Sequence, residues 1–401
     1  MAAGVLAAFA LSYAALVAAV ALRAGALEAI AVLILAYTAL TWSWGRAAWS
    51  LVHVATTWGD LRVFVFIFLS MLLAGVLRER GILDLMVDSA GRVGCRFSLA
   101  AVPAMIGLMP MPGGALVSAI AMRRRYLEEA GLPREWATYL NYWFRHVWVP
   151  SWPLFQSMVI TASVFAVDPA VIAGHTWPAT IAAILAGALV SAPLLARLEC
   201  PDTRGRGGLG GLAASLSPFA LVALLAFGLH LGLLESLAIT VAAVVAALRP
   251  GWRELRSALG LAVRPRIHGV LLEALMFKNL LIATGAPGAL MGALQSSGVP
   301  AVAVAYLLPF TLGLSAGGEN FFAATAMPLL AGLIASGSGI DWRMMLVAYT
   351  GGYLGVMASP VHLCLVLTSE YYESGLGKPL ALTLASIGVA TGLLALALAL
   401  A

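Results

Sequence analysis

Four of the ionisable side chains inside long apolar segments of this 401-residue chain could do chemistry there, where charge is unusual. Arg145 and His146 fall within TYLNYWFRHVWVP, Lys278 lies about ten residues into IHGVLLEALMFKNLLIATG, and Glu319 directly follows a Gly-Gly pair in GLSAGGENFF. If these segments cross a bilayer, a charge at its centre costs about 2.5–3.5 kcal/mol, so each charged group needs a partner or a function. Positive groups outnumber negative ones among them, which favours an anion over a cation as the bound species.

Each of these side chains has a functional and a structural interpretation. In the functional one, Arg145 and Lys278 are counter-charges for an anionic substrate. Glu319 then carries a coupling proton, with His146 as a second proton-coupling candidate. In the structural one, Lys278 and Glu319 form an ion pair, Arg145 satisfies nearby carbonyls, and His146 packs among aromatic side chains.

Composition places these residues in an integral membrane protein. Hydrophobic residues make up 62% of the chain, charged residues make up 10%, and the mean hydropathy is +0.97. A soluble domain is about 45–50% apolar and about 25% charged. The net charge of +5 comes from arginines clustered in a few loops, which indicates membrane topology rather than nucleic-acid binding. Cys95, Cys200 and Cys364 form no CxxC pair, so we expect no metal site, no cofactor and no disulfide framework.

Ten apolar segments are candidate membrane spans, since a bilayer core of about 30 Å takes roughly 20 helical residues. They are 3–22, 27–45, 61–77, 137–165, 171–196, 212–230, 235–248, 268–290, 343–369 and 379–400. Two further regions, 97–122 and 299–331, are divided by Pro/Gly-rich sequence into arms too short to cross. We therefore expect an all-α, multi-pass protein of the cell membrane with about ten transmembrane helices and two re-entrant hairpins.

The arginines around the first hairpin support this topology. The loops 78–96 and 123–135 contain four arginines each. A re-entrant hairpin puts both loops on the cytoplasmic side, as the positive-inside rule prefers, whereas a single span would separate them. The flanks of the second hairpin, LQSSGV and ASGSGI, carry no charge and are expected outside. The alternative, twelve simple spans, breaks this rule.

The two hairpins resemble each other and indicate an internal repeat. GLMPMPGGALVSAIAM (107–122) aligns with GLSAGGENFFAATAMP (313–328), and SWPLFQSMVIT (151–161) aligns with ASPVHLCLVLT (358–368). The expected topology gives the two halves opposite orientations, a pattern typical of secondary transporters. The predicted segments are N-terminal scaffold helices in 1–60, a first repeat in 61–196, linking scaffold helices and cytoplasmic loops in 197–266, and a second repeat in 267–401.

Helix breaks converge at 110–114, 149–153, 315–318 and 358–360. Irregular backbone survives at membrane depth only inside protein or beside an aqueous cavity. Half-helix N-termini suit an anion, and freed carbonyls suit Na⁺; kinks satisfied by Ser and Thr side chains are the alternative. The residues that we expect to bind substrate or a coupling ion are Pro112, Gly113, Gly114, Ser118, Asn141, Arg145, Trp152, Lys278, Asn279, Ser315, Gly317, Gly318, Glu319, Asn320, Ser359 and His362.

The stretches GLMPMPGG, NYWFRHVW and ASPVHLCLVLTSEYY resemble an uncharacterised membrane family, domain of unknown function 401. More distantly, that family is similar to the ion-transporter superfamily of the gluconate, citrate and divalent-anion permeases. The wider resemblance implies an elevator-type mechanism, in which a hairpin domain carries substrate across a dimeric scaffold. The Ser-Asn-Thr motifs of the divalent-anion branch are absent, and the hairpin tips here read MPMPGG and SAGGEN.

These observations predict a secondary transporter of a small anion, coupled to H⁺ or Na⁺, that works in the lipid bilayer as a homodimer. An intramembrane enzyme is a second class, but HExxH and GxGD-like motifs are missing. The carboxylate pair of DLMVD, Asp84 and Asp88, lies in an arginine-rich loop and is expected to be solvated. We therefore expect no enzyme. A passive channel or a structural membrane component is the third class.

Overall fold

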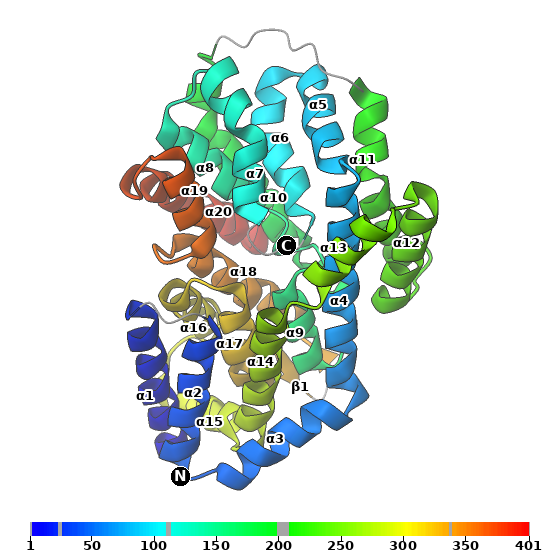
Figure 1. The fold of residues 1–401 in the computed structure, drawn as a ribbon. Helices are drawn as coiled ribbons and strands as arrows, with labels where there is room; N and C mark the ends of the chain where they lie inside the picture. The colour runs from blue at the N-terminus through cyan, green and yellow to red at the C-terminus, as the bar shows by residue number, and fades with distance from the viewer. Residues whose placement is uncertain (1, 23–25, 110–113, 199–207, 337–338, 401) are drawn as a thin grey trace. The chain divides into compact units, whose positions relative to one another are not determined.

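The computed structural model describes residues 2–22, 26–109, 114–198, 208–336 and 339–400, and it is almost entirely helical there (Figure 1). The first eleven elements are α1 (Ala2–Ala21), α2 (Ala26–Thr41), α3 (Trp44–Thr56), α4 (Trp58–Glu79), α5 (Ile82–Val93), α6 (Cys95–Gly107), α7 (Gly114–Arg123), the π-helical turn η1 (Arg124–Glu129), α8 (Arg134–Arg145), α9 (Gln156–Phe165) and α10 (Pro169–Leu195). The rest are α11 (Gly208–Ala223), the π-helical turn η2 (Leu224–Gly228), α12 (Leu233–Leu248), α13 (Trp252–Ala262), α14 (Pro265–Ala283), α15 (Ala286–Ser297), α16 (Ala301–Ala316), α17 (Glu319–Ile334), the antiparallel strands β1 (Ala335–Ser336) and β2 (Gly339–Ile340), α18 (Trp342–Ala358), α19 (Leu363–Tyr372) and α20 (Gly377–Leu400).

The chain divides into two compact units, which are described separately. Unit 1 comprises Met1–Val65, Gln156–Thr176 and Arg264–Ser359, and unit 2 comprises Phe66–Phe155, Trp177–Val263 and Pro360–Ala401. At two places where the chain passes from one unit to the other, the boundary falls at a helix break, before α9 and after α18. Each unit takes one hairpin together with half of each broken helix. The predicted segments of the repeat stay a prediction.

The membrane character of the helices is clear, but the expected ten spans are not confirmed. Over the described residues, five helices are long and apolar enough to cross a bilayer, or six if the bent pair α13–α14 and α15 is one span. The five are α4, α10, α11 with η2, α18 with α19, and α20. The apolar stretches Ala3–Ala19 in α1, Leu27–Thr41 in α2 and Leu233–Leu248 in α12 have 10–17 residues each, and 137–165 is divided by its break.

Both predicted hairpins are pairs of short helices joined at a break. The first consists of α6 and α7, with 13 and 10 residues, and the second of α16 and α17, with 16 each. At about 1.5 Å per residue, each arm is shorter than a bilayer core. The second break is set by Gly317, which has φ 63° and whose N–H donates to the Gly313 carbonyl at 2.8 Å. A re-entrant course for either hairpin stays a prediction.

The two broken helices also occur where the sequence predicts them. α8 ends at Arg145 and α9 begins at Gln156, so the break spans the predicted Pro150 and Pro153. α18 ends at Ala358 and α19 begins at Leu363, on either side of Pro360. Proline cannot donate a backbone hydrogen bond, and it disfavours helical geometry in the residue before it, which accounts for both breaks.

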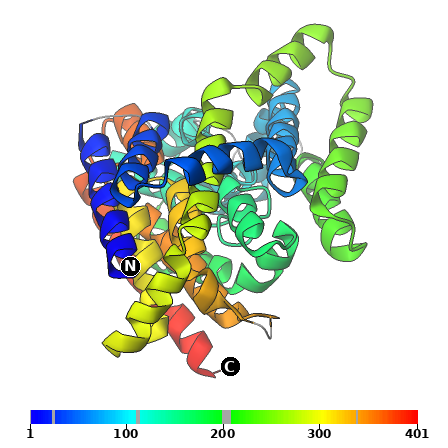
Figure 2. The ribbon, with the colours of Figure 1, turned by 90° about the horizontal axis from the view of Figure 1, so that it is seen from below.

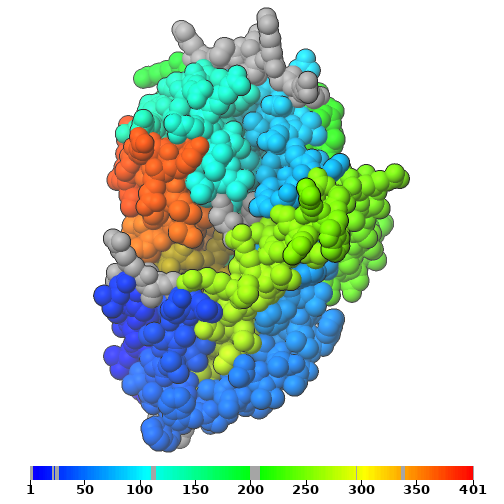
Figure 3. All heavy atoms as spheres, viewed as in Figure 1, coloured from blue at the N-terminus to red at the C-terminus, as the bar shows by residue number. Residues whose placement is uncertain are grey.

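The order of elements recurs along the chain. A long helix, a short helix, a hairpin, a broken helix and a long helix occur as α4 to α10 and again as α14 to α20. The packing is reciprocal: α7 contacts α19 within unit 2, and α17 contacts α9 within unit 1. Figure 3 shows the first contact as an orange surface beside a blue-green one. The opposite orientation of the two halves stays a prediction.

Each unit is held by apolar helix packing. In unit 1, buried side chains of α1, α2, α14, α16 and α17 form one cluster, including Phe9, Tyr37, Phe277 and Phe321. Figure 2 shows α1 and α2 side by side at its edge. In unit 2, α11 packs on α5, and a Cβ added at Gly211 would overlap the Ser89 hydroxyl. Small residues permit this close approach of helices.

Candidate functional site

Arg145 is a buried cation held between the arms of the first hairpin. It ends α8 and is 4% exposed. A Cβ added at Gly107 would overlap the Arg145 carbonyl oxygen, and one added at Gly114 would overlap its guanidinium group. Both glycines therefore let the hairpin backbone close on Arg145. Pro112 and Gly113, expected at the tip of this hairpin, lie outside the described residues.

The guanidinium of Arg145 has spare binding capacity. Its buried Nε has no hydrogen-bond partner among the described residues. None of the ion pairs formed in the described part of the chain includes Arg145. A buried charge without a counter-charge is costly, so this geometry suits a bound anion.

Two other predicted residues of unit 2 are occupied by internal hydrogen bonds. The Ser118 hydroxyl donates to Asn141 Oδ1 at 2.6 Å. Asn141 Nδ2 donates to the Ala115 carbonyl at 3.0 Å and to Thr368 Oγ1 at 3.2 Å. The amide thus uses both donors and its acceptor to join α7, α8 and α19, which indicates that Asn141 positions the half-helices.

Trp152 is also engaged with the protein. Its indole N–H donates to the Leu108 carbonyl at 2.9 Å, just beyond the end of α6. Its ring meets Phe219 edge to face, with centroids 6.2 Å apart. The side chain is buried, and its hydrogen bond links the segment between α8 and α9 to the end of α6.

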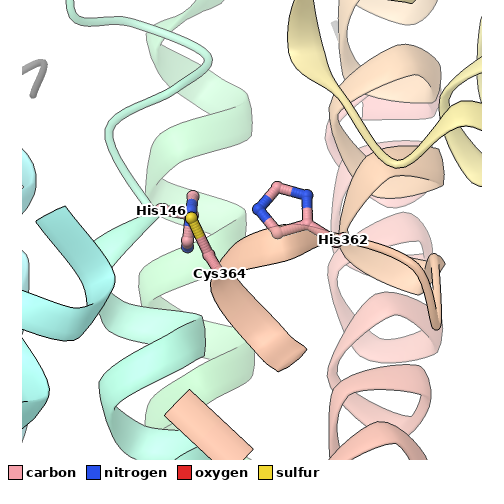
Figure 4. Close-up of side chains that lie close together, drawn as sticks. All are labelled: His146, His362 and Cys364. Carbon is pink, nitrogen blue, oxygen red and sulfur yellow. The ribbon is translucent and has the colours of Figure 1, made fainter. Parts of the chain in front are cut away.

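His146 and His362 lie together, although 216 positions separate them (362 − 146). Their ring centroids are 5.1 Å apart and their planes are almost perpendicular. His146 Nδ1 lies 2.6 Å from the Tyr142 carbonyl, and both rings contact the ring of Tyr142. Figure 4 shows Cys364 beside them. The sequence identified both histidines separately but gave no sign that Cys364 belongs with them.

In unit 1, the break of the second hairpin meets the start of α9. Ser157 Oγ donates to Glu319 Oε2 at 3.3 Å and lies 2.9 Å from the Tyr349 hydroxyl. Asn320 Nδ2 donates to Gln156 Oε1 at 2.8 Å. The N-termini of α17 and α9 therefore come together around Glu319. A carboxylate is stabilised in the first turn of a helix.

The remaining predicted residues of this break differ in their surroundings. Gly317 and Gly318 separate α16 from α17. The Ser315 hydroxyl donates back to the Thr311 carbonyl of its own helix at 2.7 Å. Ser359, at the break after α18, is fully buried, and its hydroxyl has no partner among the described residues.

Lys278 forms an ion pair within the protein, as its structural interpretation expects, but the partner is Asp60 and not Glu319. Its Nζ lies 2.5 Å from Asp60 Oδ1, and Asn279 Nδ2 donates to Asp60 Oδ2 at 2.9 Å. The ion pair with Glu319 that the sequence allows is not formed. Asp60 was missed because it lies in the first turn of α4, where a carboxylate is expected to face water.

The cysteines differ from the expectation of no disulfide. Cys95 is disulfide-bonded, and Cys364 is not. The sequence could not show this, because the pairing of cysteines cannot be read from their spacing.

Comparison with known proteins identifies a family and a fold. The family model described as "Protein of unknown function (DUF401)" matches residues 6–401. Among solved structures, the chain is similar to the Alcanivorax borkumensis YdaH transporter, with 17% identity and a TM-score of 0.55. That match covers 82% of this chain and 83% of that one. At this identity the likeness concerns the fold. No curated protein matches the chain.

Proposed function

We propose a transport function for this chain, which belongs to the DUF401 family of proteins of unknown function. The membership confirms the resemblance seen in GLMPMPGG and NYWFRHVW. In this proposal the protein is a secondary active transporter of the cell membrane that moves a small organic or inorganic anion, driven by H⁺ or Na⁺. Its fold, shared with the YdaH transporter, supports transport as the general activity.

The environment of Arg145 is the observation that supports an anion as the substrate. The guanidinium is buried against Gly114 at the start of α7, and no carboxylate of the described residues pairs with it. A planar guanidinium binds carboxylate or phosphate oxygens through two parallel hydrogen bonds. The positive end of α7 adds to the same attraction. We therefore place the anion at Arg145 and the first turn of α7.

Coupling is assigned to Glu319 in unit 1. This carboxylate is half-buried and accepts a hydrogen bond from Ser157, which also contacts Tyr349. Hydroxyl groups around a carboxylate can stabilise it with or without its proton, as a coupling group requires. His146 is the second candidate from the sequence, but its Nδ1 is engaged with the Tyr142 carbonyl.

We propose that the protein moves its substrate by an elevator-type mechanism and that it forms homodimers in the membrane. Two hairpins and two broken helices support the elevator-type mechanism, because discontinuous helices form the substrate sites of transporters with internal repeats. The reciprocal packing of α7 on α19 and of α17 on α9 supports a repeated plan for the two halves. Crosslinking of the purified protein in lipid would test the homodimer, and a monomer would contradict it.

Anion binding to the purified protein tests the proposal directly. Carboxylates, phosphate and sulfate are titrated calorimetrically against wild type and the Arg145→Gln variant. We expect at least about a tenfold loss of affinity, because a hydrogen bond to a charged group contributes about 1.5–3 kcal/mol. The Arg145→Lys variant should recover only part of the lost affinity, since lysine lacks the planar guanidinium group that makes two parallel hydrogen bonds.

The matched control is Arg124→Gln. The side chain of Arg124 is 81% exposed and pairs with Glu129 at the surface, so its loss should leave affinity unchanged. If no anion binds wild type, or if Arg145→Gln binds as wild type does, the assignment to Arg145 is wrong.

A further inference from the structure

Three side chains with metal-binding donors meet in unit 2 at the two helix breaks. His146 directly follows α8. His362 occupies the N-cap position of α19 without a side-chain capping hydrogen bond, and Cys364 is the second residue of α19. One donor atom of each lies within 4.8 Å of the other two. Both histidines are buried, and Cys364 is half-buried. Figure 4 shows the His362 ring directed toward the Cys364 sulfur and His146.

One of these ligands is already oriented. His146 Nδ1 lies 2.6 Å from the Tyr142 carbonyl, which can only accept, so Nδ1 carries the proton. Nε2 is then the atom with the free lone pair. Metal-bound histidines usually donate their other ring N–H to a carbonyl or carboxylate in this way, which fixes the tautomer and the ring.

We propose that His146, His362 and Cys364 bind one divalent cation of the zinc class, with His146 coordinating through Nε2. Two imidazole nitrogens and a thiolate suit zinc and its neighbours, whereas Na⁺, Mg²⁺ and Ca²⁺ prefer oxygen ligands. Three protein ligands leave the fourth position of a tetrahedral ion for water. The proposal rests on the geometry of these three side chains and does not depend on the transport activity.

The separations fit such an ion after a small adjustment. Zn–N distances of about 2.0–2.1 Å and a Zn–S distance of about 2.3 Å place tetrahedral ligand atoms roughly 3.3–3.7 Å apart. Ligand atoms within 4.8 Å of one another therefore need to approach by about 1.5 Å at most. In this proposal the side chains of Cys364 and His362 rotate toward His146, and the thiol proton is released to water as the metal–sulfur bond forms.

Cobalt binding to the full-length protein in detergent tests the site. After treatment with a chelator, Co²⁺ is added, and we expect one ion per chain. A thiolate-to-cobalt charge-transfer band and the intense visible bands of tetrahedral cobalt should appear together. Zn²⁺ should displace the cobalt and abolish both. Absence of the charge-transfer band from wild type would overturn the proposal.

Three variants assign the ligands. Cys364→Ser should lose the charge-transfer band, and His146→Gln and His362→Gln should each weaken binding by more than about 100-fold. A ligand contributes more than the 10–100-fold of an outer-shell partner. The matched control is His175→Gln, because His175 Nδ1 makes the same contact with the carbonyl four residues earlier, and no such cluster surrounds it among the described residues. Equal binding by all four variants would contradict the assignment.

A measurement on wild type alone covers the case in which a variant fails to fold. Alkylation of the native protein is mapped by peptide mass spectrometry with and without Zn²⁺. Cys364 is not disulfide-bonded, so we expect Zn²⁺ to slow its alkylation at least about tenfold, in keeping with a metal-bound sulfur. Alkylation at the same rate with and without Zn²⁺ would also overturn the proposal.

Discussion

Arg145 and Lys278 are both buried cations, each 4% exposed, but their surroundings are opposite. Lys278 is paired with Asp60 at 2.5 Å, whereas no carboxylate among the described residues pairs with Arg145. The sequence indicated both positions because each charge interrupts an apolar run. It could not distinguish them, because the deciding partner, Asp60, lies 218 positions from Lys278. Of these two cations, Arg145 is the one that we propose as the counter-charge for a ligand.

The ion pair of Lys278 makes a prediction about stability. Lys278→Met leaves Asp60 buried without a counter-charge, which should cost about 3–5 kcal/mol. The double variant Lys278→Met with Asp60→Asn should recover much of this loss. Arg266→Gln removes the exposed partner of Glu28 and should cost less than about 1 kcal/mol. Thermal unfolding in detergent measures all three. A small effect at Lys278, equal to that at Arg266, would contradict the structural role.

Glu319 makes a prediction about coupling. Glu319→Gln removes the titratable group beside Ser157 while keeping a similar side chain. We expect uptake driven by a pH gradient to be lost and exchange of internal for external substrate to continue. Exposed Glu370 provides the control, and Glu370→Gln should retain both activities. If Glu319→Gln responds to pH as wild type does, Glu319 has no coupling role.

At the scale of elements, the breaks at 149–153, 315–318 and 358–360 could be predicted because Pro and Gly act locally. Pro150, Pro153 and Pro360 interrupt α8–α9 and α18–α19, and Gly317 ends α16. The number of spans could not be predicted in the same way. Apolar composition makes a segment compatible with the bilayer, but the observed helix ends depend on packing and on bends such as the 60° bend between α14 and α15.

The contact between α16 and α18 depends on close packing of the two helix backbones. A Cβ added at Gly351 would overlap the Tyr306 carbonyl, and one added at Gly355 would overlap the Phe310 carbonyl. Across the same contact, a Cβ at Gly313 would lie 2.7 Å from the Gly352 carbonyl. Glycines on both helices thus bring the second hairpin against the second broken helix, as small residues do in membrane proteins.

This contact makes a prediction at the element scale. Gly355→Ala places a methyl group against backbone, which cannot rotate away, so we expect a loss of about 1–3 kcal/mol in stability. Gly388→Ala in α20 is the control, because no atom lies within 4 Å of the added Cβ, and it should be neutral or slightly stabilising. Unfolding temperatures in detergent compare the two. Equal temperatures would show that the α16–α18 contact tolerates the extra volume.

For the whole molecule, the order of elements could be predicted, but the pairing of the half-helices could not. Alignment of the two hairpins indicated that α4–α10 and α14–α20 share one plan. It gave no sign that α7 packs on α19 and α17 on α9, because such contacts join halves more than 150 positions apart. The cluster of His146, His362 and Cys364 arises from that pairing, which explains why the sequence missed it.

Uptake of a labelled carboxylate into proteoliposomes, with an imposed pH or Na⁺ gradient, tests the central claim most directly. We expect accumulation above equilibrium in wild type, its collapse when the gradient is dissipated, and its loss in Arg145→Gln. The Arg124→Gln protein should accumulate substrate normally. Equilibration without accumulation, or uptake by Arg145→Gln at the wild-type rate, would contradict a coupled anion transporter whose substrate binds at Arg145.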